Sequence, residues 1–183
     1  MMTAKYQKRK RLEGQIKRIA VYSGILFLLA VAESSFFGAI KYLPATPDLI
    51  LAALVAIAIT DTPETAVVSA IIGGVLADAV GGVGNYLSPA FYFATVLIIC
   101  IFSKKMMRSY LSYLALIPAA LVARALFTLG SAYLFTNGLG FVEILRYAVL
   151  PETICTAVFS LALYPIIYIC VIPLRDRKDT SLR

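Results

Sequence analysis

Few residues in this chain carry side chains suited to chemistry, and most of those are acids set within hydrophobic sequence. Glu33, Asp48, Asp78 and Glu152 lie inside or at the start of long apolar segments, and Arg124 lies in the middle of another. A charge at the centre of a bilayer costs about 2.5–3.5 kcal/mol on insertion scales, so such residues tend to compensate one another. These five residues therefore form the candidate polar cluster, for binding or for helix packing.

The rest of the composition offers little for catalysis. Histidine is absent, which removes the commonest general base and metal ligand. The three cysteines, Cys100, Cys155 and Cys170, lie in apolar runs and are expected to pack rather than to form a disulfide or a metal site. We expect no catalytic residue, no metal and no cofactor. The least favoured hypothesis is an intramembrane enzyme that uses the acids for proton transfer.

The overall composition is that of a membrane protein. Of the 183 residues, 61% are hydrophobic and 15% are charged, whereas an ordinary soluble domain is about 45–50% apolar and about 25% charged. The net charge of +7 comes from basic residues at the ends of hydrophobic segments. That distribution sets membrane orientation and attracts anionic lipids, so nucleic acid is not an expected partner. We predict an all-α polytopic membrane protein.

Six apolar segments are candidates for crossing the bilayer. They span about residues 19–40, 48–60, 64–82, 86–103, 110–135 and 150–174. The second is short against the roughly 20 residues that a spanning helix needs. If it did not cross, every later segment would flip and basic loops would move outside, against the positive-inside rule. With six crossings, all but Lys41, Arg124 and Arg146 of the 17 basic residues lie on the cytoplasmic side.

The sequence thus predicts three parts. Residues 1–18 form a basic cytoplasmic arm, residues 19–174 a six-helix transmembrane domain, and residues 175–183 a basic cytoplasmic tail. Both termini are expected to be cytoplasmic. The arm serves either as a topology anchor or as a stripe that binds anionic lipids.

The third segment carries two adjoining rows of small residues at helical spacing, which predict a packing groove. Its members are Ser69, Gly73, Gly74, Ala77, Gly81 and Gly82. Small side chains let the backbone of another helix approach closely. Asp78 lies in this groove, so we expect it to face protein rather than lipid. Its expected partner is Arg124, because the two fall at a similar estimated depth in the outer half of the membrane.

Two helix starts share a proline followed by an acid, in "TPDL" (Asp48) and "LPET" (Glu152). One interpretation is ordinary helix amino-terminal chemistry, since proline suits the first turn and an acid complements the positive end of the helix dipole. The other interpretation places both acids in the polar cluster. Tyr92 is expected near an interface, as an aromatic anchor.

Three stretches together resemble the rod shape-determining protein MreD family: "PDLILAALVAIAI", "IIGGVLADAVGGVGNYLSP" and "LPETICTAVFSLALYPIIY". The resemblance covers about residues 47–168, with the same size and helix count. The positions that match the family motifs are Asp48, Asp78, Gly81, Gly82, Pro151 and Glu152. The chain departs from the family in having no tryptophan and a long basic arm. The resemblance therefore does not indicate which surfaces of this chain face a partner.

The resemblance implies a non-enzymatic subunit of the bacterial cell-elongation complex, located in the inner membrane, which binds MreC and helps control peptidoglycan synthesis and cell shape. Further implied partners are the glycosyltransferase RodA with a class B penicillin-binding protein, and the actin-like MreB filament. The implied fold is similar to the substrate-binding subunits of energy-coupling-factor transporters. The alternative function is such a vitamin-uptake subunit, whose outer pocket the five residues of the polar cluster would line.

The six-helix topology is testable by cysteine labelling in intact cells. A membrane-impermeant thiol reagent should label Asn137→Cys from outside and should not label Lys105→Cys, because the positive-inside rule places the loop of Lys105 in the cytoplasm. External labelling of Lys105→Cys would contradict the scheme.

Overall fold

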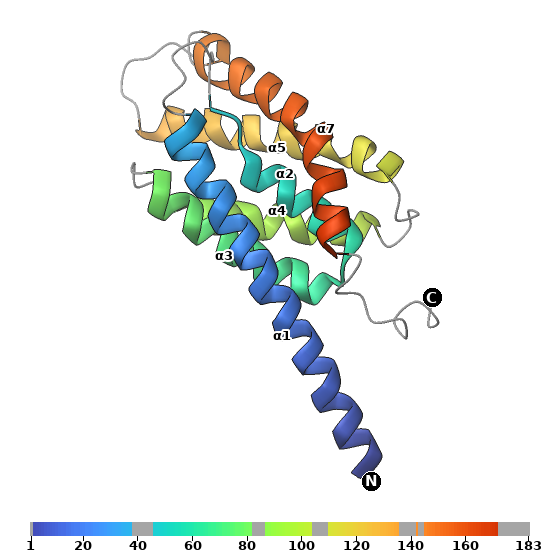
Figure 1. Cartoon of the computed structure of the whole chain (residues 1–183). Helices are drawn as coiled ribbons and strands as arrows, with labels where there is room; N and C mark the ends of the chain where they lie inside the picture. Colours follow the sequence, from blue (N-terminus) through green and yellow to red (C-terminus); the bar gives the residue numbers. More distant parts are fainter. Residues whose placement is uncertain are drawn as a thin grey trace.

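The computed structural model describes residues 2–37, 46–81, 87–103, 110–135, 142 and 145–171, and its regular structure in these residues is entirely helical (Figure 1). The α-helices are α1 (Met2–Val31), α2 (Leu49–Thr60), α3 (Pro63–Gly81), α4 (Ser88–Ser103), α5 (Tyr110–Phe135) and α7 (Leu150–Val171). Two short π-helical stretches extend this set, η1 (Ala32–Phe37) after α1 and η2 (Leu145–Val149) before α7. Consecutive α-helices run in opposite directions through one bundle (Figure 1).

Four of these helices are long and apolar enough to cross a membrane. The suitable stretches are Leu12–Ser35, Pro63–Val80, Tyr110–Ser131 and Leu150–Cys170. Helices α2 and α4 are also apolar but have only 12 and 16 residues. At 1.5 Å per residue α2 is about 18 Å long, less than the roughly 30 Å of a hydrocarbon core. The structure therefore supports a multi-pass membrane protein, and crossing by α2 and α4 stays a prediction.

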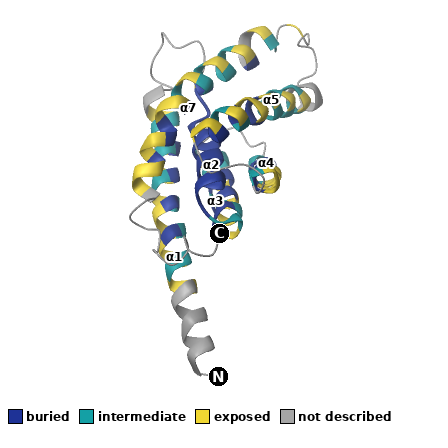
Figure 2. Cartoon of the chain, turned by 90° about the vertical axis from the view of Figure 1, so that its right-hand side faces the viewer, coloured by how far each residue is buried: buried dark blue, intermediate teal, exposed yellow. Residues whose placement is uncertain are grey.

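Helix α2 is the centre of the bundle. Each of its 12 residues is buried, and Figure 2 shows it dark blue along its whole length. It packs against each of α1, α3, α4, α5 and α7, most extensively against α7. A helix that is hydrophobic on every side is typical of such a central position, because no face of it meets a polar environment. This burial explains why the sequence of α2 shows no amphipathic pattern.

The surrounding helices turn apolar side chains outward. On α4 the exposed residues include Phe93, Leu97 and Ile101, and on α7 they include Ile154 and Val158. In water such surfaces would be unfavourable, whereas in a bilayer they meet lipid tails at no cost. The outward-facing composition is therefore that of a bundle embedded in lipid.

The observed helix bounds agree with the expected segments to within a few residues, except at the first. Helix α1 begins at Met2 and continues unbroken through the boundary predicted between residues 18 and 19. Its first part projects beyond the bundle as a continuation of the same helix (Figure 1). The predicted tail at residues 175–183 lies outside the described residues.

Two small residues of α3, Gly73 and Gly74, lie in close contact with neighbouring helices. A side-chain carbon added at Gly73 would meet Ile50 and Leu54 of α2 at 3.2 and 3.3 Å. One added at Gly74 would lie 2.3 Å from the Cα atom of Pro89, on α4. The backbones of α3 and α4 therefore approach each other at Gly74, as small residues in membrane helices permit.

The other members of the predicted groove have separate surroundings. Ser69 is fully buried, and its hydroxyl has no hydrogen-bond partner within the described residues. Ala77 packs against the core from a partly buried position. Gly81 is the last residue of α3, and Gly82 lies outside the described residues.

Gly74→Ala should destabilise the protein, because even one methyl group would overlap the backbone of Pro89. Overpacking of this kind costs about 1–3 kcal/mol. The measurement is the free energy of unfolding in a detergent mixture.

Gly24→Ala on α1 is the matched control, since nothing lies within 4 Å of the added carbon. Alanine has the higher helix propensity by about 1 kcal/mol, so this variant should be unchanged or more stable. If both variants lost the same stability, the close approach at Gly74 would not be supported.

Candidate functional site

Arg124 of α5 joins the starts of two other helices. Its Nε atom lies 3.1 Å from Asp48 Oδ2, just before α2, and 3.2 Å from Glu152 Oε1, in the first turn of α7. Asp48 is only 2% exposed, so this contact is shielded from solvent. Breaking a buried ion pair leaves an uncompensated charge, which is strongly destabilising. The three residues form the centre of the candidate site.

The Asp48 carboxylate has further partners. Its Oδ1 atom accepts a hydrogen bond from the backbone N–H of Leu51 at 2.8 Å and so caps α2. The hydroxyl of Tyr92 donates to both carboxylate oxygens, at 3.0 and 2.9 Å. The backbone N–H of Asp48 donates to Thr156 Oγ1 of α7 at 2.9 Å. Both interpretations of the proline–acid motif therefore apply here, because Asp48 caps its helix and also binds Arg124.

Aromatic rings enclose the guanidinium group. The Arg124 Cζ atom lies 5.6 Å from the ring centroid of Phe91 and 5.7 Å from that of Tyr92, both on α4. Phe91 stacks in turn on Phe127 of α5, with ring centroids 4.6 Å apart. Cation–π contacts within about 6 Å are favourable and gain strength when water is excluded. Helices α2, α4, α5 and α7 thus all meet at Arg124.

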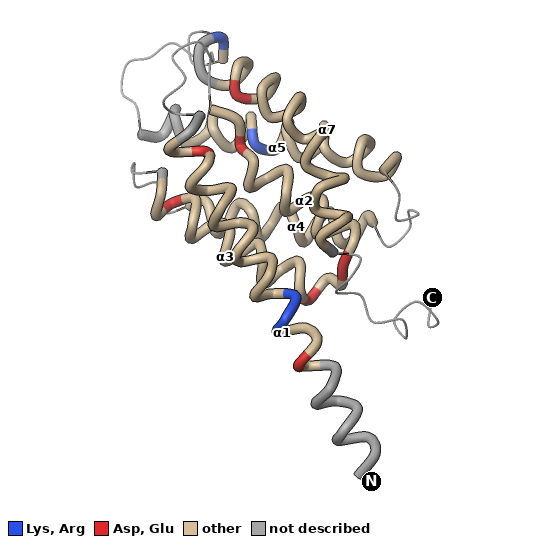
Figure 3. Tube along the Cα trace, in the orientation of Figure 1, with Lys and Arg blue, Asp and Glu red and all other residues tan. Residues whose placement is uncertain are grey.

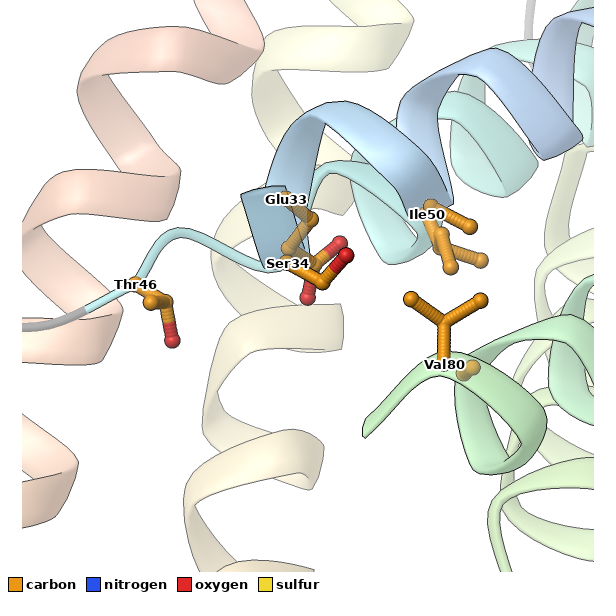
Figure 4. Close-up of a pocket in the computed structure, with 7 residues that line it drawn as sticks. Glu33, Ser34, Thr46, Ile50 and Val80 are labelled. Atoms are coloured by element: carbon orange, nitrogen blue, oxygen red, sulfur yellow. The ribbon is translucent and has the colours of Figure 1, made fainter. Parts of the chain in front are cut away.

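Glu33 lies at the edge of this cluster. Its carboxyl group interacts electrostatically with Asp48, Arg124 and Glu152, but its Oε2 atom has no hydrogen-bond partner among the described residues. The same side chain lines a pocket of about 310 Å³. In Figure 4 the oxygen atoms of Glu33 and Ser34 lie close together, and the side chains of Ile50 and Val80 face each other.

Asp78 is not a partner of Arg124, and the predicted pairing of these two residues is wrong. Asp78 is partly buried and makes no hydrogen bond or ion pair within the described part of the chain. The physical reason is the helix arrangement. Helix α3 packs mainly on α4, α1 and α2, whereas α5 packs mainly on α7 and α2. A similar depth of two residues in the membrane therefore does not imply that their helices pack on each other.

The position of Tyr92 differs from the one that the sequence predicts. It was expected as an interfacial anchor, yet it is only 1% exposed and bonds to Asp48. A buried tyrosine hydroxyl needs a hydrogen-bond partner, and the Asp48 carboxylate supplies one. No spacing rule links Tyr92 to Asp48, because they lie on different helices. Thr156 was also missed, although its position one turn after Glu152 on α7 is visible in the sequence.

A second buried ion pair closes the opposite end of α2. Arg18 of α1 lies 2.9 Å from Asp61 Oδ1, and both residues are at most 6% exposed. The Tyr22 hydroxyl donates to Asp61 Oδ2 at 2.7 Å, and the backbone N–H of Thr62 donates to Oδ1 at 2.7 Å. Figure 3 shows charged residues gathered towards the two ends of the bundle. The sequence predicts Arg18 to lie in the basic cytoplasmic arm, and it indicates no role for Asp61.

The cluster of Glu33, Asp48, Arg124 and Glu152 contains three acids and one base. Within the described residues, no three His, Cys, Asp or Glu side chains are arranged to hold a metal ion. The arrangement is suited to holding helices in place against one another. A comparison with known protein families, curated proteins and solved structures finds no match for this chain.

Asp48→Asn should strongly destabilise the protein, because Arg124 would lose the charge of its most buried partner. Because Glu152 still contacts Arg124 in this variant, we expect a loss of about 1–3 kcal/mol, as for a buried hydrogen-bonded charge that loses one partner. The free energy of unfolding in a detergent mixture measures the effect.

Asp78→Asn is the matched control, with the same change at an acid that has no partner in the described structure. Its effect should stay within about 0.5 kcal/mol. A larger loss for Asp78→Asn than for Asp48→Asn would reverse the assignment of the site.

Proposed function

We propose that this chain is a non-enzymatic membrane subunit of the bacterial cell-elongation complex, of the kind that MreD represents. One observation carries the proposal. The two proline–acid motifs on which the family resemblance rests, at Asp48 and Glu152, meet at one arginine and tie α2 and α7 to α5. Acids used in this way stabilise a scaffold.

The geometry favours a rigid body that other membrane proteins recognise. A bundle braced around the buried α2 presents the outer faces of α4, α5 and α7 within the membrane. Apolar surfaces of this kind can pack against the transmembrane helix of a partner such as MreC. In this proposal RodA and its class B penicillin-binding protein associate with the same assembly, which MreB filaments follow from the cytoplasm.

In this proposal all six helices cross the inner membrane, and both termini lie in the cytoplasm. The basic arm then projects from the cytoplasmic face, where anionic lipids attract lysine and arginine by about 1 kcal/mol for each residue near the surface.

A second candidate function is a substrate-binding subunit of an energy-coupling-factor type transporter. The pocket of about 310 Å³ beside Glu33 favours it. Pockets for small molecules begin at about this size and combine apolar walls with a few polar groups.

Affinity purification of the full-length, tagged chain discriminates between the two. The chain is expressed in a rod-shaped bacterium depleted of its own MreD, and the proteins that accompany it from solubilised membranes are identified. We expect MreC in the eluate and restored rod shape. A retained vitamin without MreC would favour the transporter subunit instead.

Arg124→Ala tests whether the braced bundle is needed for this role. It should abolish both the capture of MreC and the rescue of rod shape, since the starts of α2 and α7 lose their common partner. Lys17→Ala removes an exposed base elsewhere on the chain and should leave both unchanged. Rod shape rescued equally by the two variants would count against the proposal.

A further inference from the structure

We propose that the accessible edge of the ion pair between Arg124 and Glu152 binds a zwitterion in which an anionic oxygen and a primary ammonium group lie a few bonds apart, as in phosphoethanolamine. Both a lipid headgroup and a small soluble molecule present this chemistry. The inference goes beyond the proposed function and does not depend on it, because it concerns polar atoms of α5 and α7 that the helix bundle itself leaves unbonded.

Arg124 has hydrogen-bond donors that its contacts within the bundle do not use. Its Nε atom makes the contacts with Asp48 and Glu152, whereas neither Nη1 nor Nη2 donates a hydrogen bond to a described residue. Neither Nη atom is buried, and the side chain as a whole is 23% exposed. The terminal nitrogens of this arginine are therefore open to a ligand, although the arginine also holds helices together.

Acceptors lie beside these donors. Glu152 accepts from Arg124 Nε through its Oε1 atom, but its Oε2 atom accepts no hydrogen bond in the described structure and is not buried, since the side chain is 21% exposed. Thr128 follows Arg124 by one turn of α5 and so lies on the same face of that helix. Its hydroxyl group is likewise accessible and makes no hydrogen bond to a described residue. One accessible edge thus carries both donors and acceptors.

The balance of charge selects the kind of ligand. Arg124 contacts the carboxylates of both Asp48 and Glu152, so acids outnumber bases in this contact. An anion alone would meet that excess of negative charge, and a cation alone would leave the donors of Arg124 unbonded. A zwitterion satisfies both groups, because its anionic oxygen accepts from the Nη atoms and its ammonium group donates to Glu152 Oε2. The ammonium must be primary, since a quaternary nitrogen has no N–H to donate.

The guanidinium group is held in place before a ligand arrives. Its Cζ atom lies 5.6 and 5.7 Å from the ring centroids of Phe91 and Tyr92, and Phe91 stacks on Phe127. A group that is already fixed loses little conformational freedom when it binds, so more of the interaction energy appears as affinity. In this respect Arg124 differs from a mobile arginine on a protein surface.

Thermal unfolding of the full-length chain in phosphatidylcholine nanodiscs tests binding of the soluble form. O-phosphoethanolamine at about 10 mM should raise the melting temperature by roughly 3 °C, as expected for a ligand at about ten times its dissociation constant. O-phosphocholine, which differs only in its N-methyl groups, should not, because it cannot donate to Glu152. Ethanolamine and inorganic phosphate at the same concentration should not raise it either.

A second set of nanodiscs distinguishes the lipid from the soluble source. Half of the phosphatidylcholine is replaced by phosphatidylethanolamine with the same acyl chains, and the melting temperature is measured without a soluble ligand. A rise with the lipid alone identifies a lipid headgroup as the ligand. A rise with the soluble compound alone identifies a small molecule, and a rise with both identifies a site that is open to either.

Variants connect these effects to the proposed edge. Glu152→Gln removes the acceptor for the ammonium group and should abolish the rise. Glu64→Gln, the same change at an exposed acid towards the other end of the bundle, should preserve it. Thr128→Leu keeps every charge but obstructs the approach to Arg124, so it should abolish the rise as well and decides the matter if Glu152→Gln does not fold.

The proposal is overturned if neither phosphoethanolamine nor phosphatidylethanolamine raises the melting temperature. An equal rise with phosphocholine, ethanolamine or phosphate also overturns it, because the pairing of the two charged groups would then be irrelevant. A rise that persists in Thr128→Leu overturns it too, since it would reflect a general effect of the bilayer or the solvent.

Discussion

The structure depends on one helix, α2, that is buried along its whole length and has a buried ion pair at each end. Helix α2 contributes apolar surface to every neighbour, so the other helices pack around it. Asp48 at its start binds Arg124, and Asp61 at its end binds Arg18. The 12 residues between them separate the two pairs by about 18 Å. Each pair fixes the axial position of α2 against another helix, which apolar contacts alone do not specify.

Buried ion pairs are weak as a source of net stability but strong as a constraint on arrangement. The desolvation of two charges offsets much of their attraction, whereas a displaced helix would leave a charge unpaired in a medium that cannot solvate it. At Arg124 this constraint acts on several helices together, because Asp48, Glu152 and the rings of α4 all meet there. The cluster therefore selects one packing of α2, α4, α5 and α7. This is the property that a scaffold for other membrane proteins requires.

The sequence by itself determined that the chain is helical and has apolar segments long enough to cross a membrane, the approximate bounds of most of its helices, and the choice of Asp48, Arg124 and Glu152 as members of a candidate polar cluster. These features are local, since continuous hydrophobicity marks a helix and a charge inside it marks a residue in need of a partner. Only the tertiary structure decided which partner each charge has. It joined Arg124 to Asp48 rather than to Asp78, brought the Tyr92 hydroxyl to the same carboxylate, and paired Arg18 with Asp61. Helical periodicity assigns a residue to a face and a depth, but the neighbour of that face depends on how all the helices pack around α2.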